Sequence, residues 1–277
     1  MMNGENTKKI RLGLIGKDVS KSLSERMHRF ILQEMGVECD YERFSITPRE
    51  LDDVIWRLMG DFDGFNITIP YKRDIFEYLD DIDADAVACG AVNTVVSATK
   101  CGYNTDGAGF LLMLATKGIQ VKDKSVLILG FGGAGRSAAV ALKNAGATVF
   151  AYRRNQIELK EACAQIGVTP TENPEKGGYD IIVNTTGVGM HDSVGVSPVS
   201  EKAFDGVKVA VDMIYEPKKS EFLRLAESKG LQICNGDSML FYQAYYADCI
   251  YLQQKQSERE AKALYKKYLA AYGEKGE

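Results

Sequence analysis

The sequence predicts an α/β protein. Short aliphatic runs alternate with segments of helical apolar spacing along most of the 277 residues. One such run, 126–129, leads directly into the glycine-rich stretch Gly130-Phe-Gly-Gly-Ala-Gly-Arg136, after which helical spacing resumes. Strands that alternate with helices form largely parallel sheets with helices packed on their faces. A chain of this length suits one large domain or two smaller ones.

The first hundred residues contain five predicted strands, interleaved with helical segments. Hydrophobic runs bounded by glycine, proline or polar residues place the strands at 10–15, 39–46, 65–69, 91–97 and 101–103. Apolar spacing places helical segments at 22–35, 47–59, 73–79, 84–89 and 105–117. Ser22 with Glu25 predicts a capping box for the first helix. Thr47 and Pro48 predict a capped start for the second.

The second half repeats the alternation. Strands are predicted at 126–129, 147–152, 180–184, 207–213 and 231–234. Helices are predicted after Gly130 to about Leu142 and at 157–166, 221–227, 236–254 and 258–272. No internal repeat or low-complexity linker interrupts the pattern, so both halves are expected to be folded.

The amino-acid composition limits the kinds of partner that the protein is expected to bind. The chain is 45% hydrophobic and 26% charged, with a net charge of −4 and no long run of either sign. Nucleic acid and anionic membranes are therefore not predicted as partners. No apolar segment is long enough for a signal peptide or a membrane span. Six cysteines without a C-x-x-C pair then predict reduced, mostly buried thiols in the cytoplasm.

Histidine is scarce, which limits the catalytic chemistry that the chain can use. His28 and His191 are the only two, and neither has a partner at metal-ligand spacing. We therefore predict neither a metal site nor a Ser-His-Asp triad.

Polar side chains follow several predicted strands of the first half. In open α/β sheets, ligands bind beyond the carboxyl ends of the strands. Each residue also has an ordinary explanation: Lys72 as a solvated lysine, or Asp106 as a complement to a helix dipole. Together they offer hydroxyl, amide, ammonium and carboxylate groups, which would suit a polyhydroxylated acid. These residues are Asn66, Thr68, Lys72, Asn93, Thr94, Asn104, Thr105 and Asp106.

The glycine-rich stretch predicts a seat for a diphosphate. Glycines let the backbone approach a phosphate closely, and the amide groups at the helix N-terminus favour negative charge. The G-x-G-x-x-G pattern is carried by Gly130, Gly132 and Gly135, and Arg136 follows its last glycine. The favoured interpretation is a Rossmann-like nucleotide-binding domain, and the alternative is an ordinary strand-to-helix turn.

The strand at 147–152 indicates which dinucleotide binds. A site that prefers NAD usually has an acidic residue near the end of this strand. Here the strand ends in Tyr152-Arg153-Arg154-Asn155. Two guanidinium groups suit the 2′-phosphate of NADP, although a solvated basic turn is the alternative. We therefore predict NADP as the cofactor, with Arg136 adding positive charge near the phosphates.

At this point the motifs together match one family: the chain resembles the shikimate dehydrogenases from Gly16 to about Gln254. The resemblance rests on Ser22-x-Ser24 followed by Met27-His28, on N-I-T-x-P-Y-K (66–72), on G-A-V-N-T (90–94) and on G-x-N-T-D (102–106). It continues with G-x-G-G-A-G-R (130–136), D-x-x-Y-x-P (212–217) and G-x-x-M-L-x-x-Q (236–243).

The resemblance implies the reversible NADPH-dependent reduction of 3-dehydroshikimate to shikimate, a step of aromatic amino acid biosynthesis, by a monomer or homodimer. Lys72 and Asp106 would form the catalytic pair, and Ser22 and Ser24 would bind the substrate carboxylate. The remaining substrate ligands would be Thr68, Asn93, Asp106, Tyr215 and Gln243. The expected NADP contacts are Gly130, Gly132, Gly133, Ala134, Gly135, Arg153, Arg154, Thr185, Met213 and Gly236.

The resemblance also implies two domains separated by a cleft. A substrate domain would comprise residues 1–104 and 238–277, and a Rossmann-like NADP-binding domain would comprise residues 105–237. Around the serines the family usually has G-x-P-[IV]-x-H-S-x-S-P-x-x-H-N. The positions of the first proline, the first histidine, the second proline and the asparagine hold Asp18, Lys21, Glu25 and Arg29. The cofactor turn usually reads N-R-T, where this chain has Tyr152-Arg153-Arg154.

Two other functions stay open. A quinate dehydrogenase, or one that accepts both quinate and shikimate, is the nearest, although serine at both Ser22 and Ser24 favours shikimate. A non-catalytic NADP-binding protein with the same fold is the other. Such a protein would be expected to have lost Lys72 and Asp106, and both are present.

Overall fold

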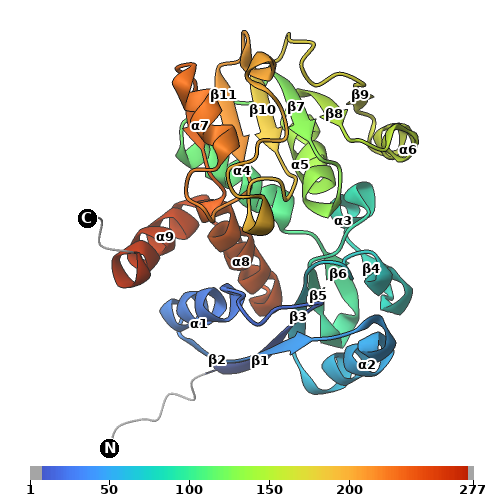
Figure 1. Cartoon of the computed structure of the whole chain (residues 1–277). Coiled ribbons are helices and arrows are strands. Elements are labelled where there is room, and N and C mark those ends of the chain that lie inside the picture. The colour runs from blue at the N-terminus through green and yellow to red at the C-terminus, as the bar shows by residue number, and fades with distance from the viewer. Residues whose placement is uncertain (1–7, 274–277) are drawn as a thin grey trace, which may run out of the picture. The chain divides into compact units, whose positions relative to one another are not determined.

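The protein folds into two compact units, each built on its own six-stranded sheet (Figure 1). The computed structural model describes residues 8–273. Within this range the first unit comprises 8–87, 91–105 and 241–273, and the second comprises 88–90 and 106–240. The predicted α/β class is confirmed. The assignment of substrate to one unit and of NADP to the other stays a prediction.

The first unit has a mixed sheet in the order β2-β1-β3-β5-β6-β4. β1 pairs in parallel with β2 and β3, and β4 pairs in parallel with β6. β5 is antiparallel to both β3 and β6, and a short 3₁₀ turn joins β5 directly to β6. The strands are β1 Lys8–Gly16, β2 Val37–Ser45, β3 Gly64–Ile67, β4 Asp81–Ile82, β5 Thr94–Val96 and β6 Cys101–Tyr103.

Helices of the first unit follow the predicted apolar spacing, with one error at a helix start. α1 begins at Ser24 with Leu23 at the N-cap, so the capping box predicted for Ser22 and Glu25 is wrong. The box forms instead at Thr47 and Glu50, ahead of α2. The helices are α1 Ser24–Glu34, α2 Leu51–Asp61 and α9 Glu258–Tyr272, while α3 Ala84–Cys89 and α8 Asp237–Leu252 each cross from one unit to the other.

The second unit has a fully parallel sheet in the order β12-β11-β10-β7-β8-β9. This is the strand order of the dinucleotide-binding Rossmann fold, and it reverses between β7 and β10. The strands are β7 Ser125–Leu129, β8 Thr148–Tyr152, β9 Thr169–Pro170, β10 Ile181–Asn184, β11 Val209–Asp212 and β12 Gln232–Cys234. The helices are α4 Asp106–Thr116, α5 Gly133–Asn144, α6 Gln156–Ile166 and α7 Glu221–Ser228.

Each unit has its own buried apolar core, which fixes the strand ends where ligands bind in such sheets. In the first unit, α8 packs closely on the sheet: a side chain at Gly64 in β3 would meet the ring of Tyr251 at 2.4 Å. All six cysteines are buried, and no disulfide forms among residues 8–273. No helix among residues 8–273 is long and apolar enough to cross a membrane.

Candidate functional site

The first part of the candidate site is the segment that precedes α1, where the two predicted serines lie together. The Ser22 hydroxyl donates to the Ser24 hydroxyl at 3.0 Å, and the Ser24 amide donates to Ser22 Oγ at 3.2 Å. Both side chains are half-buried. Two adjacent hydroxyl groups that bond to each other can each turn to donate to one oxygen of a carboxylate.

The unusual residues around these serines form a polar network of their own. Glu25 pairs with Arg29 at 3.2 Å and with Arg43 at 3.1 Å. Asp18 accepts hydrogen bonds from the Ser20 amide at 3.0 Å and the Ser20 hydroxyl at 2.7 Å. These contacts hold the loop without the proline and asparagine residues that the family pattern has there.

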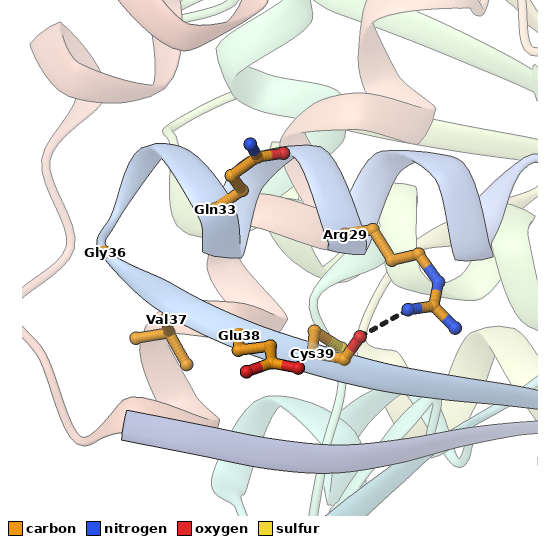
Figure 2. Close-up of a pocket in the computed structure, with 6 residues that line it drawn as sticks. All are labelled: Arg29, Gln33, Gly36, Val37, Glu38 and Cys39. Carbon is orange, nitrogen blue, oxygen red and sulfur yellow. Dashed lines mark hydrogen bonds between the residues drawn. The ribbon is translucent and has the colours of Figure 1, made fainter. Parts of the chain in front are cut away.

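Arg29 is directed toward β2 (Figure 2). Its guanidinium donates to the carbonyl of Cys39 and, at 3.3 Å, to the carbonyl of Tyr41, both on the edge strand β2. It borders a cavity of about 450 Å³ that none of the predicted site residues lines. The lining residues are Arg29, Gln33, Gly36, Val37, Glu38 and Cys39.

The second part is a buried cluster of amide and hydroxyl groups around Asn93. Asn93 Oδ1 accepts from the Thr105 amide at 2.9 Å and from the Thr94 hydroxyl at 2.9 Å. Asn93 Nδ2 donates to Thr105 Oγ1 at 2.9 Å and lies 3.5 Å from Gln243 Oε1. The fold thus brings together Asn93 and Gln243, which were predicted to contact the same ligand from distant parts of the sequence.

Asn66 extends this cluster to β3. Its Nδ2 donates to the Asn93 carbonyl at 3.3 Å and to Thr94 Oγ1 at 3.4 Å, and its Oδ1 accepts from the Tyr41 hydroxyl at 3.1 Å. Buried polar groups are tolerated when they are hydrogen-bonded, so the network fixes the direction of each amide.

The predicted catalytic residues lie at the ends of two elements. Lys72 follows β3 in the turn that begins at Thr68, and its carbonyl accepts from the Val92 amide at 2.8 Å. The Lys72 side chain is half-buried. Asp106 is buried and is the first residue of α4, where the second unit begins. Their action as a pair stays a prediction.

The third part is the loop that joins β7 to α5 in the second unit, at the point where the strand order reverses. Gly130 has a φ of +88°, a conformation that favours glycine, and a side chain there would meet Thr185 Oγ1 at 3.0 Å. A side chain at Gly135 would meet Thr185 Oγ1 at 2.7 Å. These two glycines therefore allow β10 and the start of α5 to pack closely.

Beside this loop lies a cavity of about 640 Å³ in the second unit. A side chain at Gly132, the N-cap of α5, would meet nothing within 4 Å, so the helix N-terminus faces open space. The cavity, which has two arginines on its wall and lies beside the loop that precedes α5, fits a dinucleotide that carries an extra phosphate. The lining residues are Leu129, Gly130, Phe131, Tyr152, Arg153, Arg154, Asn155, Thr186, Gly187, Val188, Ser197 and Pro198.

The two predicted phosphate ligands differ in their contacts. Arg153 Nη1 pairs with Glu158 Oε2 at 2.5 Å, which leaves its other guanidinium donors for a ligand. Arg154 is exposed and has no ion pair among residues 8–273. Both arginines directly follow β8 and line the cavity.

Other predicted cofactor residues have structural contacts. The Thr185 hydroxyl donates to the carbonyls of Leu129 at 3.0 Å and Gly130 at 3.2 Å. Gly236 packs on Met213, whose carbonyl oxygen would lie 2.2 Å from a side chain at this position. These residues do not line the 640 Å³ cavity, and their contact with NADP stays a prediction.

Arg136, expected near the cofactor phosphates, is buried and absent from the cavity lining. Its Nη2 donates to Gln165 Oε1 in α6 at 3.0 Å. Its Nη1 lies 3.1 Å from the position of a side chain at Gly90. These contacts give Arg136 a structural role beside α5, and a contribution to phosphate binding stays a prediction.

The segment after β11 is held by a buried carboxylate. Asp212 accepts from the Ser220 hydroxyl at 2.5 Å, the Ile214 amide at 3.0 Å and Asn184 Nδ2 at 3.1 Å. Burial raises the pKa of Asp212, and these hydrogen bonds oppose that rise. Tyr215 follows in this segment, and burial also raises the pKa of its phenol, which keeps it protonated.

Several residues near the predicted ligands carry no sequence signal that identifies them. Tyr41 contacts Asn66, and Asp248 pairs with His28 across 220 positions of sequence. Ser197 and Pro198 line the 640 Å³ cavity without belonging to any predicted motif. Within residues 8–273, no group of three histidine, cysteine or acidic side chains could hold a metal ion.

These features define the class of protein: a two-unit α/β protein in which one unit is a Rossmann dinucleotide-binding unit with a basic edge. Comparison with known proteins identifies the family. The family described as the shikimate dehydrogenase substrate binding domain matches residues 14–95. The chain belongs to the shikimate dehydrogenases, as the following relatives establish.

A shikimate dehydrogenase (NADP(+)) from Caldicellulosiruptor bescii is 40% identical over 255 residues, which cover 87% of this chain and 88% of that protein. Shikimate 5-dehydrogenase from Thermus thermophilus, in complex with NADP(H) and shikimate, has a TM-score of 0.85 at 32% identity and covers 93% of this chain and 99% of that one. A chorismate mutase/shikimate 5-dehydrogenase fusion from Clostridium acetobutylicum has a TM-score of 0.87 at 29% identity. The match covers 95% of this chain and 98% of that one.

Proposed function

We propose that this protein is an NADP-dependent shikimate dehydrogenase that interconverts 3-dehydroshikimate and shikimate in aromatic amino acid biosynthesis. The observation that carries the proposal is the buried cluster around Asn93 and Gln243, since fixed amide and hydroxyl groups suit the ring hydroxyls of a polyhydroxylated acid. Family membership at 40% identity over most of the chain supports the same activity.

The two polar groups of the first unit supply most, but not all, of the substrate ligands in this proposal. Ser22 and Ser24 hold the carboxylate through their adjacent hydroxyls. Thr68, Asn93, Asp106 and Gln243 hold the ring hydroxyls, with Tyr215 beside them. NADP, held by the β7–α5 loop and by Arg153 and Arg154, supplies the hydride donor or acceptor when bound.

Proton transfer is assigned to Lys72. Negative charge develops on the ketone oxygen during reduction, so a nearby ammonium group that can donate a proton lowers the barrier. Asp106 positions Lys72 and accepts a hydrogen bond from the same hydroxyl of shikimate. In the reverse direction Lys72, as a neutral amine, accepts the hydroxyl proton.

Two alternatives give different results in the same assay. A quinate dehydrogenase would share the fold and the lysine but would turn over quinate faster. A non-catalytic NADP-binding protein would bind the cofactor and turn over neither acid. Both serines and the Lys72 and Asp106 residues favour an active shikimate dehydrogenase. A cytoplasmic location and a monomeric or homodimeric state stay predictions.

The direct test is turnover by the purified chain. With shikimate and NADP⁺ we expect NADPH absorbance to rise at a rate proportional to the protein concentration, with 3-dehydroshikimate as the product. Omission of either reactant should abolish the rise. A chain that binds NADP⁺, as shown by a higher unfolding temperature, but forms no NADPH would contradict the proposed activity and favour the non-catalytic alternative.

A further inference from the structure

Tyr41 on β2 lies between the two polar groups of the first unit. Its hydroxyl donates to Asn66 Oδ1 at 3.1 Å, and so contacts the amide cluster. Its ring stacks on His28 of α1, the helix that begins at Ser24. Tyr41 therefore connects the helix that carries a residue proposed for the substrate carboxylate to the cluster proposed for the ring hydroxyls.

A buried, hydrogen-bonded pair of side chains, His28 and Asp248, packs behind the ring of Tyr41. His28 stacks on it with ring centroids 5.0 Å apart and an interplanar angle of 17°. His28 Nδ1 lies 2.6 Å from Asp248 Oδ1, and both side chains are 0% exposed. His28 follows Ser24 by four positions on α1, and Asp248 follows Gln243 by five on α8. The pair thus joins α1 and α8, whose residues Ser24 and Gln243 are proposed to bind opposite ends of the substrate.

The backbone of Tyr41 is fixed as well. Arg29 donates to its carbonyl at 3.3 Å, and β2 pairs with β1 in register, with Tyr41 opposite Leu12. The side chain is 3% exposed. Burial raises the pKa of the phenol well above its ordinary value, so the hydroxyl stays a neutral donor at physiological pH.

A role in apolar packing alone would not require the hydroxyl. Phenylalanine has nearly the same shape and could stack on His28 in the same way. The hydroxyl of tyrosine is the part that contacts Asn66, and a buried amide oxygen that loses its donor is costly. The phenol oxygen is therefore the group that distinguishes a functional role from a packing role.

We propose that Tyr41 is a positioning residue for the substrate: its ring packs on His28 of α1 and its hydroxyl fixes Asn66, so that the carboxylate site at the start of α1 and the hydroxyl site are preset to the length of one small cyclic acid. This inference rests on the proposed function. Because preset ligands reduce the cost of ordering on binding, loss of the hydroxyl should weaken substrate binding rather than slow hydride transfer.

The test is Tyr41→Phe in the full chain. We expect KM for shikimate to rise about five- to tenfold, as for the loss of one buried hydrogen bond, while kcat and KM for NADP⁺ stay within about twofold. The rise in unfolding temperature caused by saturating shikimate should shrink, whereas the rise caused by NADP⁺ should not. The second readout measures binding without turnover.

Tyr245→Phe is the matched control. Tyr245 is also buried in the first unit, and its hydroxyl donates to Glu260 at 2.8 Å and accepts from the Ser257 amide at 3.0 Å. The Tyr245→Phe variant should be less stable than the wild-type chain, without a change in KM for shikimate. An unchanged KM in Tyr41→Phe, or an equal rise in both variants, overturns the positioning role. A wild-type chain that does not turn over shikimate overturns the proposed function instead.

Discussion

Substitution of Lys72 by alanine should lower kcat for shikimate oxidation by about 10²- to 10⁴-fold, with little change in KM for shikimate. The amine is proposed to interact mainly with charge that develops on the reacting oxygen, so its loss should raise the barrier more than it weakens binding. Steady-state rates with saturating NADP⁺, over a range of shikimate concentrations, separate the two constants.

Lys9→Ala is the control for this variant. Lys9 is an exposed lysine on β1 of the same unit, pairs with Asp40 of the edge strand β2 at 2.9 Å and is not among the predicted ligands. The kcat of the Lys9→Ala variant should equal that of the wild-type chain. If Lys72→Ala retains the wild-type kcat, another group must supply the proton and the catalytic assignment is wrong.

Arg153→Ala should raise KM for NADP⁺ by about 10- to 100-fold, the range expected for loss of charge-assisted hydrogen bonds to a phosphate. Arg153 lines the 640 Å³ cavity at the end of β8, and its pairing with Glu158 leaves donors free for a second anion. NAD⁺ lacks the 2′-phosphate, so its KM should change by less than about twofold. Initial rates with each cofactor at saturating shikimate measure both effects.

Lys160→Ala controls for the general loss of positive charge. Lys160 lies on α6, pairs with Glu172 at 3.0 Å and does not line the cavity. Its substitution should leave KM for both cofactors unchanged. Equal increases in KM for NADP⁺ and NAD⁺ in Arg153→Ala would argue against a contact with the 2′-phosphate and would favour a solvated basic turn at 153–154.

Sequence pattern predicted most of the fold because most elements have a clear hydrophobic period. The strand at 101–103 and the helices at 84–89 and 258–272 have the predicted bounds. β4 and β9 were missed because two-residue strands carry no period. Residues 73–79, predicted as helical, contain a 3₁₀ turn at Asp74–Tyr78. Local spacing does not distinguish it from a short α-helix.

The candidate site was harder to predict, because its contacts join distant parts of the chain. Glycine spacing predicted the β7–α5 loop, because the residues of this motif are neighbours in the sequence. Asn93 and Gln243 are 150 positions apart, and no local pattern shows that their amides meet. His28 and Asp248 are hydrogen-bonded although 220 positions separate them, and no local pattern indicates this contact. Nor does the sequence around the glycines indicate that Arg136 contacts Gln165 in α6.

The central claim is that the chain is specific for shikimate and NADP. Measurement of kcat/KM for shikimate and quinate, each with NADP⁺ and with NAD⁺, tests it most directly. The proposed roles of Ser22, Ser24 and Arg153 predict the highest value for shikimate with NADP⁺. A higher value for quinate with NAD⁺ would contradict both the substrate and the cofactor assignment.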